Sequence, residues 1–198
     1  MHSNRVRIIG GEHRGRRIAV PDRPGLRPTP DRVRETLFNW LGQDLSGWRC
    51  LDAFAGSGAL GFEAASRGAA EVVLLERDPA LAASLRHSQQ RLKAEVLRIE
   101  AADAIAWMGR AAPGSFDLVL LDPPFGSELA AQALPLALRL VSEDGFVYLE
   151  ARQSLPAAPE GWAVHRRGHA GAVNFHLLQP VRDGYTAGHS GPPRSNEP

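Results

Sequence analysis

Short apolar runs that end in acidic residues alternate with helical segments over most of the chain. Such runs occupy residues 49–54, 70–78 and 116–125, and the segments at 58–68 and 79–94 have helical patterns. Strands that are buried on both faces of a parallel sheet have continuous apolar runs of this kind. The alternation of strands and helices therefore predicts a doubly wound α/β sheet with right-handed crossovers. A length of 198 residues predicts a single main domain.

Segments at the two ends complete the predicted architecture. Residues 5–20 alternate loosely around a glycine-rich centre, which predicts a small β-hairpin, and residues 162–179 predict a second one. After the first hairpin we expect an irregular connector and a helix over 31–45 with Asp31 as its N-cap. The polar, Gly- and Pro-rich segment at 183–198 is typical of disorder. The predicted divisions are a basic arm over 1–28, a main domain over 29–182 and a tail over 183–198.

Charge is distributed unevenly along the chain. Residues 1–34 carry nine arginines and three acids, a net charge of +6, whereas the remaining chain has a net charge of −5. A basic arm on an acidic body indicates a polyanionic partner, and arginine suits bidentate phosphate contacts. A solvated, flexible N-terminus explains the same pattern equally well, so both interpretations stay open. The candidate contacts to a polyanion are Arg5, Arg7, Arg14, Arg16, Arg17, Arg32 and Arg34.

A glycine-rich sequence follows the first predicted strand of the sheet. Gly56, Gly58 and Gly61 form a G-x-G-x-x-G pattern, and Glu76 follows 20 residues after Gly56, at the end of the next strand. Both features fit a dinucleotide, whose ribose hydroxyls are held by such an acid. They fit S-adenosylmethionine (SAM) equally well, because SAM also carries a ribose diol and needs close backbone approach. The glycines therefore leave the cofactor undecided.

Acidic residues at the strand ends help to decide between the two cofactors. Asp52 precedes the first glycine by four residues, where it would repel a pyrophosphate but attract the ammonium group of a methionine moiety. Asp103, after the third strand, can accept a hydrogen bond from an adenine amine. Asp52 and Asp103 can also serve as helix N-caps. Capping alone does not account for a row of Asp52, Glu76 and Asp103 along one sheet edge, so the pattern favours SAM.

The sequence Asp122-Pro123-Pro124-Phe125 follows the fourth predicted strand directly. We expect this strand to lie beside the first, where the strand order reverses and ligands bind. Two prolines make the turn rigid, so the Asp122 carboxylate and the Pro123 carbonyl can converge on an exocyclic amine. These acceptors would stabilise the positive charge that develops on the amine during methyl transfer, while Phe125 stacks on the base. These four residues form the predicted catalytic set, which needs neither a metal nor a covalent nucleophile.

Several motifs carry a resemblance to a known superfamily. The sequences DAFAGSGALG, LLERD and DPPF resemble those of class I SAM-dependent amino-methyltransferases. With RIIGGEHRGRRI and RPTPDRVRETLFNWL included, the chain resembles the bacterial 16S rRNA (guanine-N2)-methyltransferase D family over roughly residues 5–180. The superfamily tetrapeptide often begins with Asn. Asp122 departs from that wider pattern and agrees with the rRNA family.

This resemblance implies a fold, a cofactor and a substrate. The implied fold is Rossmann-like, with a mostly parallel sheet of seven strands, a C-terminal antiparallel hairpin and a small N-terminal hairpin extension. SAM is the implied methyl donor, and the implied target is the N2 amine of guanine 966 in 16S rRNA, within a partly or fully assembled small subunit. Thr29 is carried over from the RPTPDR segment. The predicted cofactor-binding residues are Asp52, Phe54, Gly56, Gly58, Glu76, Arg77, Asp103, Ala104 and Thr29.

Other properties are expected from composition. The absence of a long apolar run and of an apolar N-terminal core predicts a cytoplasmic protein without a membrane segment. We also expect the protein to be a monomer. A lone Cys50 and the histidines at 165, 169 and 176, with no acid or cysteine to complete the set, predict no metal site. Two other activities of the superfamily stay open, methylation of adenine N6 in DNA and of a glutamine side chain in protein. A nucleotide-binding oxidoreductase and a non-catalytic RNA-binding module also stay open.

Overall fold

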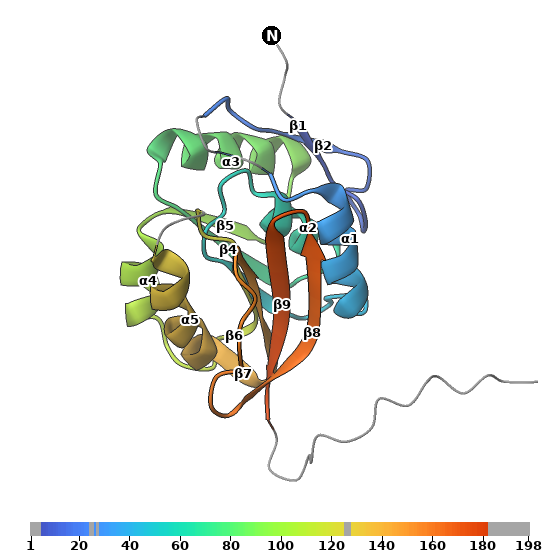
Figure 1. The fold of residues 1–198 in the computed structure, drawn as a ribbon. Helices are drawn as coiled ribbons and strands as arrows, with labels where there is room; N and C mark the ends of the chain where they lie inside the picture. The colour runs from blue at the N-terminus through green and yellow to red at the C-terminus, as the bar shows by residue number, and fades with distance from the viewer. Residues whose placement is uncertain (1–4, 24–25, 27, 125–127, 182–198) are drawn as a thin grey trace, which may run out of the picture.

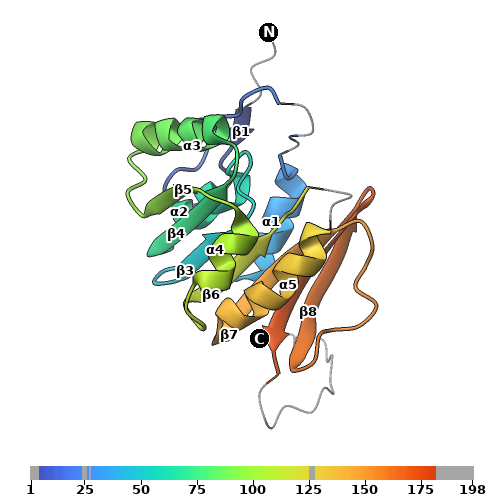
Figure 2. The ribbon, with the colours of Figure 1, turned by 90° about the vertical axis from the view of Figure 1, so that its left-hand side faces the viewer.

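The computed structural model describes residues 5–23, 26, 28–124 and 128–181. A sheet of seven strands forms its centre, with helices on both faces (Figures 1 and 2). The strands are β3 (Arg49–Asp52), β4 (Glu71–Glu76), β5 (Leu97–Ala101), β6 (Phe116–Leu121), β7 (Val141–Ala151), β8 (Trp162–Ala170) and β9 (Val173–Pro180). Their order in the sheet is β5-β4-β3-β6-β7-β9-β8. The first five in this order are parallel, and β9 is antiparallel to β7 and β8.

This topology confirms the predicted fold class. The sheet is mostly parallel, its last two strands form the C-terminal antiparallel hairpin, and a separate small sheet contains the N-terminal hairpin. Strand β6 lies beside β3 as expected, with Asp52 opposite Leu120. The strand order therefore reverses between β3 and β6, and the segments that follow these two strands meet at one edge of the sheet.

In the part of the chain that the structure describes, five helices cover the two faces of the sheet. They are α1 (Asp31–Trp40), α2 (Ala59–Ser66), α3 (Pro79–Leu92), α4 (Ala104–Arg110) and α5 (Leu129–Leu140). Side chains alternate between the faces along each strand, so Cys50 packs into the core that includes α1, α2 and α3, and Leu51 packs into the core that includes α4 and α5. Both cores contain fully buried aliphatic side chains, and they fix the strand ends that carry the acids. No helix in the described ranges is long and apolar enough to cross a membrane.

Helix α1 differs from the sequence prediction at both ends. It begins at Asp31 but has Pro30 as its N-cap, a residue whose side chain makes no capping hydrogen bond. The predicted capping role of Asp31 is therefore wrong, because its carboxylate instead binds Arg34 at 2.6 Å and Arg7 at 3.4 Å. The helix also ends at Trp40 rather than at residue 45.

The N-terminal hairpin is packed onto the main domain. Its strands β1 (Arg5–Arg7) and β2 (Arg17–Ala19) are antiparallel, with Val6 opposite Ile18. These two side chains are buried in the same core as α1 and α2, whereas the arginines of both strands point outward. The hairpin therefore holds its exposed arginines in fixed positions on the main domain. The division of the chain into an arm over 1–28 and a domain over 29–182 stays a prediction.

A buried ionic cluster joins the hairpin to α1 and α2. Glu63 is 0% exposed, and its carboxylate accepts from the Ile9 and Gly10 amides at 2.9 and 2.8 Å. It also binds Arg34 at 3.1 Å and Arg67 at 2.9 Å. The prediction that Arg34 contacts a polyanion is wrong, because its side chain is 1% exposed and is committed to this cluster.

Candidate functional site

A cavity of about 530 Å³ lies beyond the carboxyl ends of β3, β4, β5 and β6. It has the size typical of a small-molecule site and the position expected for ligands in a doubly wound sheet. The structure brings together there eleven residues of the predicted cofactor and catalytic sets: Thr29, Asp52, Phe54, Gly56, Glu76, Arg77, Asp103, Ala104, Asp122, Pro123 and Pro124.

Two members of the predicted sets are not among these eleven residues. Gly58 is the N-cap of α2 with a left-handed φ of 78°, and a Cβ there would lie 2.6 Å from Leu85 and 2.8 Å from Phe62. A glycine is therefore needed at position 58, both for the left-handed backbone conformation and because the loop leaves no room there for a side chain. Phe125 lies outside the described residues.

The glycine loop is held by Glu76 at the end of β4. One carboxylate oxygen of Glu76 accepts from the Gly56 amide at 2.9 Å, and the other accepts from the Asp78 amide at 2.7 Å. Gly56 has a left-handed φ of 49°. Glu76 therefore organises the loop around the cavity, a function that the sequence spacing alone did not reveal.

Asp52, at the end of β3, is an almost fully buried carboxylate in the cavity wall. Its Oδ2 accepts from the Gly61 amide at 2.9 Å, so the acid also holds the first turn of α2 against the end of β3. Within the described part of the chain, its Oδ1 is buried and has no hydrogen-bond partner. Burial raises the pKa of Asp52 to about 7, and the nearby Asp122 and Glu76 add to the increase. Such a carboxylate is strongly stabilised by a cation in the cavity.

The sequence left two roles open for Asp103, as a helix N-cap and as an acceptor for an adenine amine. Its Oδ1 accepts from the Ala106 amide at 2.9 Å, which makes it the N-cap of α4. It also lines the cavity beside Ala104, at the end of β5. Capping therefore accounts for its position in the sequence, and its predicted contact with an adenine amine stays a prediction.

Asp122 leaves the sheet directly after β6, at the reversal of strand order. Its Oδ2 accepts a hydrogen bond of 3.1 Å from the Thr29 hydroxyl, and Thr29 is 6% exposed. Burial raises the pKa of Asp122 to about 6, and the bond from Thr29 opposes this increase. Pro123 is buried beside Asp122, so the start of the rigid turn is fixed in the protein.

Sequence reasoning missed two buried polar residues on β7. Glu150 is 4% exposed and accepts a hydrogen bond of 2.8 Å from the Tyr148 hydroxyl. Burial raises the pKa of Glu150 to about 8, and the charge of Asp122 adds to the increase. Glu150 follows Leu149, which pairs with Leu121, so it lies at the strand end next to Asp122. An acid within the apolar run GFVYLEA was the available signal.

The connector between the hairpin and α1 closes one side of the cavity. Arg23 and Leu26 both line it, and the Arg23 guanidinium lies 3.6 Å from the Asp78 carboxylate at the rim. A Cβ on Gly56 would lie 3.1 Å from the Leu26 side chain, so the connector touches the glycine loop. The irregular connector predicted from the sequence is thus part of the site wall.

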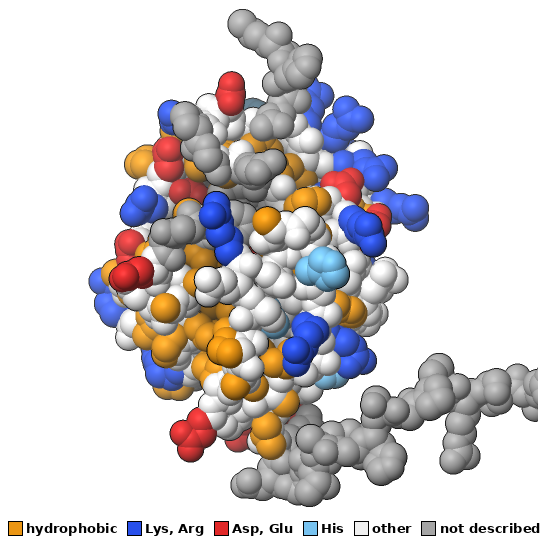
Figure 3. Space-filling view, in the orientation of Figure 1, with side chains coloured by type: hydrophobic (Ala, Val, Ile, Leu, Met, Phe, Trp, Pro, Cys, Tyr) orange, Lys and Arg blue, Asp and Glu red, His pale blue; other side chains and the backbone are white. Residues whose placement is uncertain are grey.

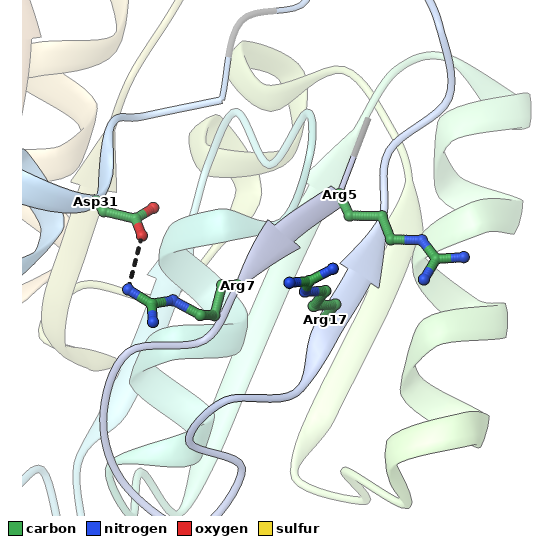
Figure 4. Close-up of a pocket in the computed structure, with 4 residues that line it drawn as sticks. All are labelled: Arg5, Arg7, Arg17 and Asp31. Atoms are coloured by element: carbon green, nitrogen blue, oxygen red, sulfur yellow. Dashed lines mark hydrogen bonds and ion pairs between the residues drawn. The ribbon is translucent and has the colours of Figure 1, made fainter. Parts of the chain in front are cut away.

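A second, open hollow of about 540 Å³ lies on the hairpin and is lined by Arg5, Arg7, Arg17 and Asp31 (Figure 4). Arg7 and Arg17 are direct cross-strand partners. Like charges in that arrangement are destabilising unless an anion lies near them. Arg7 points toward Asp31, the acid of the hollow (Figure 4). Figure 3 shows that blue side chains also gather over the hairpin and α1 at the upper right.

The other predicted RNA contacts also lie on or near this side of the molecule. Arg14 and Arg16 are exposed in the loop between β1 and β2, and Arg32 is exposed on α1. The structure therefore presents six of the seven predicted arginines at the surface and buries Arg34. In the described part of the chain, no group of three His, Cys, Asp or Glu residues is arranged to hold a metal ion.

The strand order, with its antiparallel pair at one edge and the glycine loop and acids at the reversal point, defines the fold and site of a class I methyltransferase. Comparisons with known proteins agree. Residues 6–179 match the family model described as conserved hypothetical protein 95. The ribosomal RNA small subunit methyltransferase D of Escherichia coli is 41% identical over 186 residues, which is 92% of this chain and 93% of that protein.

Two further similar proteins are also named as methyltransferases. The protein of the same name from Haemophilus influenzae is 42% identical over 182 residues, which is 88% of this chain and 93% of that protein. The solved structure of yhhF, a proposed methyltransferase from Escherichia coli, is 39% identical with a TM-score of 0.80. The superposition covers 89% of this chain and 98% of that one. The chain belongs to the conserved hypothetical protein 95 family, which includes the bacterial small subunit rRNA methyltransferases D.

Proposed function

We propose that this protein transfers a methyl group from SAM to the N2 amine of a guanine in 16S rRNA of the small ribosomal subunit. The observation that carries the proposal is the position of Asp122 and the Pro123–Pro124 turn in the wall of the cavity that also contains Asp52 and Glu76. Membership of the methyltransferase D family supports rRNA as the substrate, and the resemblance implies guanine 966.

The cavity lining fits SAM better than a dinucleotide. Asp52 has a buried oxygen that no group among the described residues binds, which suits the ammonium group of the methionine moiety. Glu76 and Asp103 lie farther along the same edge, where they would accept from the ribose hydroxyls and the adenine amine. Phe54 and Ala104 supply wall contacts, and Arg77 is exposed at the rim. Acids beside a pyrophosphate would be costly, so the row argues against NAD.

Asp122 is the proposed catalytic residue because its carboxylate can accept a hydrogen bond from the target amine. When bound, SAM supplies an electrophilic methyl group, whose bond to sulfur breaks with its electron pair remaining on sulfur. As the N–C bond forms, the amine becomes positively charged, and the Asp122 carboxylate and Pro123 carbonyl stabilise that charge. The ionised carboxylate can then take the surplus proton. Phe125 is proposed, from the sequence, to stack on the base.

The arginine hollow is the proposed contact to the RNA backbone. A phosphate between Arg7 and Arg17 would relieve the cross-strand repulsion between their guanidinium groups. The target base has to be extruded from folded RNA to reach the cavity. Contacts to the surrounding backbone would offset the cost of that extrusion, which gives the hairpin a function in binding rather than in chemistry.

A methylation assay tests the proposed function directly. The protein is incubated with labelled SAM and small subunits from a strain that lacks the corresponding enzyme, and with naked 16S rRNA, DNA and protein as alternative substrates. We expect label in 16S rRNA as N2-methylguanine, with the position mapped by nuclease digestion and mass spectrometry. Label in adenine of DNA or in glutamine would establish one of the alternative activities instead.

Replacing Glu76 with Ala should weaken SAM binding by about tenfold or more, since a hydrogen bond to a charged group contributes roughly 1.5–3 kcal/mol. Part of the loss arises because the Gly56 amide loses the carboxylate oxygen that accepts its hydrogen bond. Titration calorimetry measures the change, and Glu71→Ala at the other end of β4 serves as the control with unchanged affinity. The wild-type protein should gain no thermal stability from NAD. Unchanged SAM affinity in Glu76→Ala would remove the acid from the cofactor site.

Replacing Arg14, Arg16 and Arg17 with Ala should weaken RNA binding and make it less salt-dependent. Each lost phosphate contact to single-stranded RNA removes roughly 0.7 from the slope of log affinity against log salt concentration, so the slope should flatten by up to about two. All three side chains are exposed, so the melting temperature and the SAM affinity should hardly change. Arg98→Ala with Arg110→Ala, on β5 and α4, is the control. An unchanged salt slope in the triple variant would mean that the arginines are only solvated.

A further inference from the structure

Thr29 joins the connector to the end of β6. Its hydroxyl donates to Asp122 Oδ2 at 3.1 Å, across 93 residues of sequence. Thr29 is 6% exposed, and both residues line the cavity. The bond engages the Oδ2 oxygen of the carboxylate. It therefore restricts rotation of the Asp122 carboxylate about its side-chain bonds.

The backbone of Thr29 is itself held on several sides. Pro28 and Pro30 flank it, and a residue before proline is restricted to extended conformations. The Thr29 carbonyl accepts from Arg34 Nε at 3.3 Å. Because these contacts restrain Thr29, its hydroxyl has a fixed position beside the Asp122 carboxylate.

Arg34 connects this point to the hairpin. Its guanidinium donates to the Arg7 carbonyl at 2.9 Å and to Glu63 at 3.1 Å, and Glu63 accepts from the backbone of residues 9 and 10. A continuous chain of hydrogen bonds thus runs from the basic hairpin through Arg34 and Thr29 to Asp122. Arg34 therefore has two roles, as the counter-charge of the buried Glu63 and as a hydrogen-bond donor to the Thr29 carbonyl.

We propose that Thr29 is a positioning residue that orients the Asp122 carboxylate toward the target amine, with Arg34 holding Thr29 in place. The proposal rests on the proposed role of Asp122 and differs from the sequence prediction, in which Thr29 is a cofactor ligand. The two roles separate experimentally. A cofactor ligand affects SAM affinity, whereas a positioning residue affects the methyl-transfer step with SAM and RNA both saturating.

The test compares Thr29→Val, which keeps the shape of the side chain and removes the donor, with Thr29→Ser, which restores the donor. In single-turnover assays at saturating SAM and RNA, we expect the rate to fall about tenfold or more in the Val variant and to recover to within a few-fold in the Ser variant. The dissociation constant for SAM should stay within about twofold in both. A Val variant with weakened SAM binding and an unchanged saturated rate would overturn the proposal.

The pH dependence supplies a readout that a purely structural change would not move. The bond from Thr29 stabilises the ionised form of Asp122, so its loss should shift the acid limb of the rate to higher pH. The other titratable groups that interact with Asp122 are Asp52 from β3 and Tyr148 and Glu150 from β7. All three remain in the Val variant. An acid limb that stays in place would contradict the proposal.

A double-mutant cycle separates failure of this proposal from failure of the proposed catalytic role. If Thr29 acts through Asp122, Thr29→Val should have almost no further effect on the rate of an Asp122→Ala protein, which has no side-chain oxygen left to orient. An equal loss in both backgrounds would show that Thr29 acts elsewhere. Wild-type turnover by Asp122→Ala alone would instead remove Asp122 from the mechanism, whatever Thr29 does.

Discussion

Replacing Asp122 with Ala is expected to lower the rate of methyl transfer at least about a hundredfold while SAM affinity changes little. An aromatic exocyclic amine is a weak nucleophile because its lone pair is delocalised into the ring. The acceptor at Asp122 matters most when the nitrogen becomes positively charged, so its loss falls on the transition state. Single-turnover rates with small subunits and calorimetric SAM titrations measure the two quantities separately.

The isosteric variant Asp122→Asn is the matched control for the carboxylate charge. It keeps an acceptor oxygen in the cavity, so it should retain more activity than Asp122→Ala. The pKa of Asp122 is about 6, so wild-type activity should rise with pH through that value as the carboxylate ionises. The Asn variant should lack this acid limb. Activity near the wild-type level in Asp122→Ala would remove the residue from the mechanism.

Replacing Asp122 with Asn should raise the thermal stability of the protein, although it lowers the rate of methyl transfer. Burial raises the pKa of Asp122 above the usual value of 3.8, so the folded protein holds this proton more tightly than the unfolded chain. The stability contributed by the protonated form is complete below pH 3.8 and is lost as the pH rises through 6. At pH 8 the ionised carboxylate therefore destabilises the fold, and Asp122→Asn should melt at a higher temperature than the wild type.

The residues of the cavity could be predicted because each follows a local signal. Asp52, Glu76 and Asp122 end apolar runs that form parallel strands, and parallel strands bring their carboxyl ends to one edge. The pairing of the first and fourth strands then follows from the rules for doubly wound sheets. A short-range pattern and a general topology rule were sufficient to place these acids together.

Contacts between distant segments could not be predicted in this way. The charge of Arg34 looks the same in the sequence as that of Arg32, yet α1 turns one into the core and the other toward solvent. Asp31 was expected to cap α1, but the proximity of Arg34 and Arg7 gives its carboxylate stronger partners. Glu150 escaped notice because β7 pairs beside β6 at a register that only the fold establishes.

Glu63 was missed for the same reason, and its replacement carries the second large expected effect. Glu63→Ala should lower the free energy of unfolding by about 3–5 kcal/mol, because it removes the buried carboxylate that Arg34 and Arg67 share and leaves Arg34 with only the half-exposed Asp31 as a counter-charge. Arg34 is 1% exposed, Arg67 is 7% exposed and Glu63 is 0% exposed, so water cannot replace the lost carboxylate. The amides of Ile9 and Gly10 lose their acceptor as well.

Denaturant titrations followed by circular dichroism measure this loss, with the exposed Glu95→Gln as a charge-matched control that should change stability by less than about 0.5 kcal/mol. Glu63→Gln should lie between the two, since it keeps one acceptor oxygen but removes the charge. Because the same carboxylate anchors the hairpin, Glu63→Ala should expose the residue 9–13 backbone to hydrogen exchange before the sheet unfolds. A denaturation midpoint equal to that of the wild type would show that the cluster does not stabilise the fold. The hairpin would then be held by its other contacts, which include the buried Val6 and Ile18 side chains and the bond from Arg34 to the Arg7 carbonyl.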